Sequence, residues 1–158
     1  MQVDAVIPVR MGSTRYPGKP LVDIQGFTMV EHVYRRTKLS ETVDGTYVAT
    51  PDEEIREEAE SFGAEVIMTG EHSRATDRVA EAAESLDSDI VIVMQGDEPL
   101  VYPEMVDAAV EPMMADDSIQ CVNLGKAIES EEEFRDQNNV KVVVDKKWNA
   151  LYFSREPI

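Results

Sequence analysis

The sequence predicts an α/β fold, in which a mostly parallel, Rossmann-like sheet lies between two layers of helices. Short apolar runs alternate with amphipathic segments along the 158 residues, which is the pattern of right-handed β-α-β crossovers. The run Ile90–Met94 is apolar at every position, as expected for a central strand that is covered on both faces. The length fits one domain, so a single domain over residues 1–158 is expected.

The first half of the chain supplies two strands and two helices. Residues 3–9 are almost continuously apolar and predict a buried strand. Thr28 and Glu31 have the spacing of a capping box, and the apolar positions after them predict a helix. Two more elements complete this half: a strand at 45–50, and an acidic helix that opens at Pro51 and ends at Gly63.

The second half continues the alternation and ends in a pair of strands. The expected elements are a strand at 64–69, a helix at 76–86, the strand at 90–94, a helix at 103–114, a strand at 119–124, a short acidic helix at 129–134, and strands at 140–144 and 150–153. Cys121 lies within the expected strand at 119–124, so a small buried apolar role is predicted for it.

The chain is strongly acidic, with 32 acidic and 15 basic residues and a formal net charge of −17. Nucleic acid and anionic membrane surfaces are not expected as partners, because both are bound through clustered Lys and Arg. The acidity fits a salt-tolerant host or an ordinary acidic cytosolic protein equally well. No apolar stretch approaches the roughly 20 residues that span a bilayer. The N-terminus begins with a strand pattern rather than a signal peptide, and the single cysteine excludes an internal disulfide, so a cytoplasmic location is expected.

A cationic loop follows the first expected strand. Residues 5–22 contain Arg10, Arg15 and Lys19 and not one acidic residue. Glycines in this loop permit tight or left-handed backbone geometry, so several N–H groups can converge on an anion. Because Arg and Lys bind phosphate oxygens, a triphosphate is the leading candidate ligand; the alternative is a solvated basic loop that balances an acidic surface. The three-glycine spacing of the dinucleotide fingerprint is absent, and Gly18-Lys19 is followed by Pro20 instead of the Ser or Thr of a Walker loop, which argues against dehydrogenases and kinases.

A carboxylate loop, Gln95–Pro99, follows the central apolar strand. Asp97 is the candidate Mg²⁺ ligand, because Mg²⁺ prefers oxygen ligands and keeps phosphates in its shell. The alternative is a strand-end aspartate that only caps the next helix. Gln95 could read a ligand hydroxyl or a base through its amide. Ligands of such sheets bind outside the carboxyl ends of the strands, so the carboxylate and cationic loops are expected to face one pocket.

Several short motifs, in one order along the chain, give a resemblance to a known family. They are Ile7-Pro8-Val9-Arg10, Ser13-Thr14-Arg15, Pro17-Gly18-Lys19-Pro20-Leu21-Val22, Val48-Ala49-Thr50, Gln95-Gly96-Asp97-Glu98-Pro99, Val140-Lys141-Val142-Val143 and Leu151-Tyr152-Phe153-Ser154-Arg155. On these residues the chain resembles the sugar-acid cytidylyltransferases, most of all those for 3-deoxy-manno-octulosonate. The resemblance implies the nucleotide-diphospho-sugar transferase type of fold with its C-terminal part absent, and a homodimer where that part is present.

The resemblance also implies a reaction: CMP passes from CTP to a sugar acid, with Mg²⁺ and release of pyrophosphate, for surface polysaccharide (lipopolysaccharide) biosynthesis. Arg10 and Lys19 would grip the triphosphate and, with Asp97 as the metal ligand, form the catalytic set. Further nucleotide contacts are implied for Gly12, Ser13, Arg15, Ala75, Thr76 and Arg78, and a contact with ribose or the sugar acid for Gln95. The family usually has Ser-Gly where this chain has Arg74 and Ala75. Another sugar or nucleotide, or a nucleotide-binding module without activity of its own, are the alternatives.

Overall fold

The computed structural model describes residues 1–12 and 16–158. They form two compact units, Met1–Leu124 and Gly125–Ile158. The expectation of a single domain over residues 1–158 stays a prediction.

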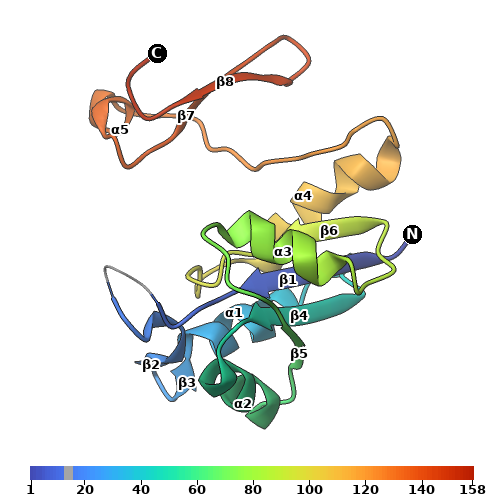
Figure 1. The fold of residues 1–158 in the computed structure, drawn as a ribbon. Coiled ribbons are helices and arrows are strands. Elements are labelled where there is room, and N and C mark those ends of the chain that lie inside the picture. The colour runs from blue at the N-terminus through green and yellow to red at the C-terminus, as the bar shows by residue number, and fades with distance from the viewer. Residues whose placement is uncertain (13–15) are drawn as a thin grey trace. The chain divides into compact units, whose positions relative to one another are not determined.

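The larger unit is built on a sheet of parallel strands, which confirms the predicted α/β class. Its strands are β1 (Val3–Pro8), β4 (Gly45–Thr50), β5 (Glu65–Met68) and β6 (Ile90–Val93), in the order β5-β4-β1-β6 (Figure 1). The chain builds outward from β1 to β4 and β5, then crosses back to place β6 on the other side of β1. A topological switch point therefore lies between β1 and β6, and ligands of open α/β sheets bind outside the carboxyl ends of the strands at such a point.

Helices cover both faces of the sheet, so the predicted three layers are confirmed (Figure 1). The helices are α1 (Met29–Thr37), α2 (Glu53–Ser61), α3 (Ala75–Ala83) and α4 (Pro103–Ala115). Side chains from α1 and α2 pack on one face, in a buried cluster that includes Ile7, Val30, Val33, Val48, Ile55 and Ala59. Side chains from α3 pack on the opposite face, with Val6, Ala49, Val79 and Ala82. Neighbouring residues of β1 and β4 thus point to opposite faces, as the period of two in a strand requires.

Short elements between β1 and α1 were not predicted. A 3₁₀ turn, η1 (Lys19–Leu21), precedes a small antiparallel hairpin of β2 (Asp23–Ile24) and β3 (Phe27–Thr28). Gln25 and Gly26 form the hairpin turn, and both have positive φ, of 58° and 92°, as a type I′ turn requires.

The predicted capping box at the start of α1 is wrong. Thr28 occupies the N-cap position, but its hydroxyl makes no cap hydrogen bond and is buried without a partner among the described residues. Glu31, the other half of the box, instead accepts a hydrogen bond of 2.8 Å from Arg35 Nε, one turn further along the helix. Glu31, which the sequence pattern assigns to the helix start, thus binds Arg35 instead.

The predicted strand at 119–124 is also wrong, and Cys121 is exposed rather than buried. Alternating apolar residues predict which side chains share a face, but a strand also needs a neighbour to satisfy its backbone N–H and C=O groups. Residues 119–124 pair with no strand in the part of the chain that the structure describes. A smaller correction concerns Pro51, which precedes the N-cap Asp52 of α2 instead of opening the helix.

The smaller unit consists of α5 (Glu131–Arg135) and a hairpin of β7 (Lys141–Val144) and β8 (Ala150–Ser154), so the predicted late strand pair is confirmed. Lys141 is only 2% exposed. Its ammonium group donates hydrogen bonds to three backbone carbonyls, those of Asp136 (2.5 Å), Asn139 (3.0 Å) and Arg155 (2.7 Å). Among the described residues, no helix has both the length and the apolar composition to cross a membrane.

Candidate functional site

The two loops singled out in the sequence leave the sheet side by side, at the ends of β1 and β6. Gly96, in the carboxylate loop, packs directly on β1: a Cβ at this position would lie 2.3 Å from Cγ1 of Val9 and 3.1 Å from the carbonyl oxygen of Pro8. Only glycine allows so close an approach. This contact brings the carboxylate loop against the root of the cationic loop.

The cationic loop turns back on itself before it reaches Lys19. Gly18 has a left-handed backbone (φ +73°) and its N–H donates to the carbonyl of Met11 (3.2 Å). The N–H of Met11 in turn donates to the carboxylate of Asp52 (2.8 Å), which lies just after β4. Pro20 then fixes the 3₁₀ turn that begins at Lys19. The loop is thus closed by its own backbone and anchored by a side chain from the neighbouring strand end.

Lys19 and Asp97 form an ion pair, with 2.6 Å between Nζ and Oδ2. The pair joins the cation that the sequence assigns to phosphate with the carboxylate that it assigns to Mg²⁺. Both side chains remain partly open to solvent, with 34% and 46% of their surface exposed. A ligand can therefore reach both groups from outside, and the pair can be exchanged for contacts to the ligand.

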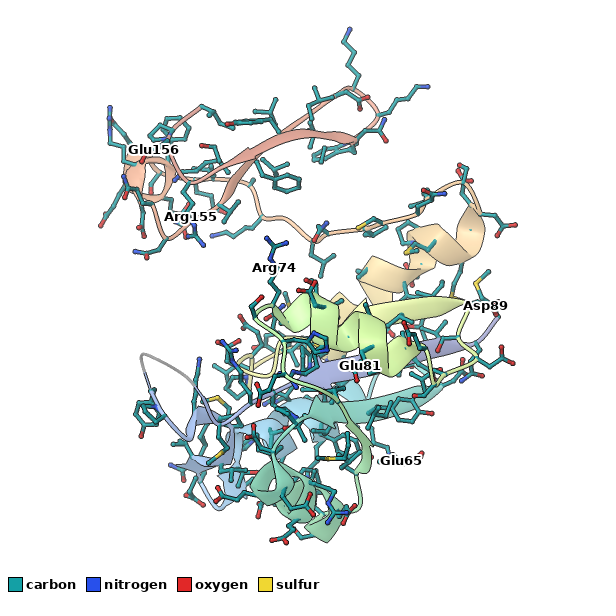
Figure 2. All side chains as sticks on the ribbon, in the orientation of Figure 1. Glu65, Arg74, Glu81, Asp89, Arg155 and Glu156 are labelled. Atoms are coloured by element: carbon teal, nitrogen blue, oxygen red, sulfur yellow. The ribbon has the colours of Figure 1, made fainter. Side chains whose placement is uncertain are left out.

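A second cationic group gathers around a pocket of about 140 Å³ beside the end of β1. The pocket is lined by Pro8, Val9, Arg10, His72, Ser73, Arg74, Ala75 and Arg78. Arg10 reaches across to the loop before α3, where its NH1 donates to the carbonyl oxygen of His72 (3.1 Å). Arg74 lies at the start of α3 with its side chain extended away from the sheet (Figure 2). The structure therefore brings Arg10, Ala75 and Arg78, which are distant in the sequence, to one pocket.

Arg78 is the buried member of this group, at 2% exposure. Its NH1 donates to the hydroxyl of Thr69 (2.6 Å) and to the carbonyl of Gly70 (3.3 Å). Burial is the main reason that the pKa of Arg78 is lowered; the charge of Glu71 opposes this shift and the nearby charge of Arg10 adds to it. Three arginine residues, Arg10, Arg74 and Arg78, thus line one pocket, which favours an anionic ligand.

The remaining predicted residues are placed as follows. Gly12, Thr76 and Gln95 are exposed, with Thr76 in the first turn of α3 and Gln95 at the start of the carboxylate loop. Thr76 and Gln95 are not among the residues that line the pocket of Arg10. Ser13 and Arg15 lie outside the described residues.

Asp97 remains the candidate Mg²⁺ ligand. Residues 1–12 and 16–158 contain no group of three or more His, Cys, Asp or Glu side chains that could hold a metal ion. One exposed carboxylate still fits Mg²⁺, because Mg²⁺ is commonly bound by one or two carboxylates together with phosphates and water. Asp97 could therefore bind Mg²⁺ together with the phosphates of a nucleotide.

Three residues of the site were missed in the sequence: Asp52, His72 and Glu81. Asp52 anchors the cationic loop, while Glu81 accepts hydrogen bonds from His72 and from the N–H of Gly70. Asp52 had a usable signal, because it follows a strand that neighbours β1 and so must lie at the same sheet edge. His72 and Glu81 had none beyond their proximity in sequence to Arg78.

Comparison with known proteins gives a consistent picture. A family model described as cytidylyltransferase matches residues 5–158. The 3-deoxy-manno-octulosonate cytidylyltransferases of Geobacter metallireducens and Thermodesulfovibrio yellowstonii are 47% and 46% identical, over 100% and 97% of this chain. The chain spans only 63% of the length of each of these relatives.

Solved structures agree with the sequence relatives. A CMP:2-keto-3-deoxy-manno-octonic acid synthetase complexed with CTP matches all of this chain and 66% of its own, with a TM-score of 0.96 and 40% identity. A cytidylyltransferase from Leptospira borgpetersenii matches 75% of this chain and 51% of its own, with a TM-score of 0.67 and 29% identity.

Proposed function

Because the chain belongs to the cytidylyltransferase family, we propose that it serves the transfer of CMP from CTP to a sugar acid of the 3-deoxy-manno-octulosonate class. The observation that carries the proposal is the meeting of Lys19 and Asp97 at the switch point of the sheet. A cation for phosphate and a carboxylate for Mg²⁺ are the two groups that nucleotidyl transfer needs in one place. We further propose that the complete protein is a homodimer that acts in surface polysaccharide biosynthesis.

The chemistry is an in-line displacement at the α-phosphorus of CTP. The anomeric hydroxyl of the sugar acid gives its proton to water, and its oxygen forms the new bond to the α-phosphorus. The bond from the α-phosphorus to the bridging oxygen breaks, and pyrophosphate leaves with the electron pair. Arg10 and Lys19 neutralise the charge that grows on the departing pyrophosphate. Asp97 would hold Mg²⁺ beside the phosphates, where the metal supplies further neutralisation of the same charge. No covalent enzyme intermediate is needed.

Nucleotide recognition is assigned to residues around Arg10 and in the cationic loop. In this proposal the backbone of Gly12 and the side chains of Ser13 and Arg15 support the triphosphate. Ala75, Thr76 and Arg78, at the start of α3, contact the nucleoside. Gln95 contacts ribose or the sugar acid through its amide.

The first experiment measures pyrophosphate release with each of four nucleoside triphosphates and a panel of sugar acids. Activity with CTP and a 3-deoxy-manno-octulosonate-like acid is the expected result. Lys19→Ala and Asp97→Ala should each lower the rate by roughly 10²–10³-fold, the effect of losing one such charge contact. Lys146→Ala is the matched control, because Lys146 is exposed in the turn between β7 and β8. Rates for the two site variants within tenfold of the parent would remove these residues from the mechanism.

The second experiment measures equilibrium binding of CTP with and without Mg²⁺. Asp97→Asn frees Lys19 from its ion pair, so metal-free CTP should bind at least as tightly as to the parent, while the Mg²⁺ dependence of binding is lost. Lys19→Met should weaken binding under both conditions. Because the chain spans only part of its relatives' length, CTP binding without turnover would instead favour a nucleotide-binding module.

A further inference from the structure

One carboxylate on α3 organises the loop that precedes this helix. Both carboxylate oxygens of Glu81 accept from the N–H of Gly70, at 3.1 and 3.0 Å, and Oε2 also accepts from Nε2 of His72. Figure 2 shows Glu81 on α3. The loop is thus tied to the helix through both its backbone and a side chain, by charge-assisted hydrogen bonds that are stronger than neutral ones.

The same loop provides the contact that orients Arg10. The carbonyl oxygen of His72 accepts from NH1 of Arg10 at 3.1 Å. His72 therefore faces two ways, with its ring on Glu81 and its carbonyl on Arg10. A shift of the loop by about 1 Å would break this contact, since hydrogen bonds weaken rapidly beyond roughly 3.2 Å.

We propose that Glu81 and His72 are positioning residues, which hold the loop so that Arg10 presents its guanidinium to the triphosphate. The role of Arg10 as a triphosphate ligand rests on the proposed function; the chain of contacts from Glu81 through His72 to Arg10 does not. The carboxylate is suited to the task because the hydrogen bond from His72, together with that from Gly70, lowers the pKa of Glu81. Glu81 is therefore ionised at neutral pH and accepts all of these bonds.

The arrangement also explains why the loop uses a carbonyl to orient Arg10. A carbonyl fixes the direction of a guanidinium without cancelling its positive charge, whereas a carboxylate in the same place would compete with phosphate. The negative charge of Glu81 is directed at His72 and Gly70 instead. The charge of Arg10 thus stays available to an anionic ligand.

The test compares CTP binding by Glu81→Ala, Glu81→Gln and the control Glu84→Ala. Glu84 is an exposed acid at the end of the same helix, so its removal changes the net charge equally without touching the loop. Glu81→Ala should raise the dissociation constant of CTP by roughly 10-fold to 100-fold, as misplacement of a binding group by about 1 Å does. Glu81→Gln keeps an acceptor and should recover binding to within a few-fold of the parent. Equal constants for the Glu81→Ala and Glu84→Ala variants would overturn the proposal.

A double-mutant cycle separates positioning from a general structural effect. If Glu81 acts through Arg10, the Glu81→Ala change should have no further effect on CTP binding in an Arg10→Ala background. An undiminished effect in that background would refute the proposal. Far-UV circular dichroism checks the fold. If Glu81→Ala does not fold, His72→Ala takes its place in the cycle, because it removes the ring that binds Glu81.

A readout without ligand distinguishes this inference from the proposed function. If the parent binds no CTP, the proposed function fails, and the nitrogen-15 spectrum of the Arg10 guanidinium in the free chain then decides the positioning role. Hindered rotation of the Arg10 guanidinium in the parent, lost in Glu81→Ala and kept in Glu84→Ala, supports the proposal. The same rotation in all three proteins overturns it.

Discussion

Replacement of Gly96 by alanine should separate the two loops of the site. The added Cβ would lie 2.3 Å from Cγ1 of Val9, whereas carbon atoms in contact are about 3.5–4.0 Å apart. One of the two must therefore move by roughly 1 Å. Val9 is only 6% exposed and belongs to the buried cluster beneath α1 and α2, and valine has few alternative rotamers. The carboxylate loop is thus the part that should yield.

The expected cost is about 1–3 kcal/mol in the free energy of unfolding, the usual effect of one extra group in a packed site. Urea denaturation followed by far-UV circular dichroism measures it. Gly125→Ala is the control, because a Cβ at Gly125 meets nothing within 4 Å. Val9→Ala removes the clashing methyl groups, so the double variant should lose at least about 1 kcal/mol less than the sum of the two single changes. A cost for Gly96→Ala no larger than that of the control, or strict additivity with Val9→Ala, would refute the packing argument.

Three further predictions concern other parts of the chain. Lys141→Met removes charge-assisted hydrogen bonds to three carbonyls, each worth about 1.5–3 kcal/mol. The backbone amides of β8 should therefore show much faster hydrogen exchange with solvent. Lys146→Met should leave these exchange rates unchanged. Burial raises the pKa of Asp107, but hydrogen bonds, first among them that from Ser40, outweigh this and leave the pKa below its ordinary value of 3.8. The carboxylate therefore stabilises the fold above about pH 3.8 and loses this effect as the pH falls through the lowered pKa; in Asp107→Asn the urea midpoint should lack this acid-dependent loss. Arg74 lines the pocket of Arg10, and Arg74→Ala should weaken CTP binding by on the order of tenfold in calorimetry, about the worth of one charge-assisted contact; an unchanged constant would place Arg74 outside the site.

The fold was predictable because its signals are local and periodic. Short, mainly apolar runs identified β1, β4, β5 and β6, and amphipathic segments identified the four helices of the larger unit. Parallel pairing places the carboxyl ends of all these strands at the same edge of the sheet, so the sequence already predicts that the loops carrying Lys19 and Asp97 lie close together. In the structure the two side chains do meet, with 2.6 Å between Nζ of Lys19 and Oδ2 of Asp97.

What could not be predicted depends on which partner each group contacts in the folded chain. The segment 119–124 has the alternating apolar residues of a strand but, among the described residues, no neighbouring strand to pair with. The sequence pattern shows the alternation and cannot show whether a neighbour is present. Thr28 has the spacing of a capping residue, yet Glu31 is taken by a cation one turn away. The contact of Arg10 with His72 joins residues 62 positions apart, and no local pattern encodes it.

The electrostatics of the site follow from which acceptors hold its cations. On α1 and α2, away from the site, Arg35 and Arg56 pair with carboxylates of their own helices, which is the expected behaviour in a chain with a net charge of −17. Arg10 and Arg78 are held instead by carbonyl and hydroxyl oxygens. A neutral acceptor orients a guanidinium without neutralising its positive charge. Arg10 and Arg78 can therefore attract a triphosphate, which the acidic remainder of the surface repels. Lys19 is the exception, because it pairs with the carboxylate of Asp97. In the proposed function this carboxylate would bind the metal that accompanies the triphosphate.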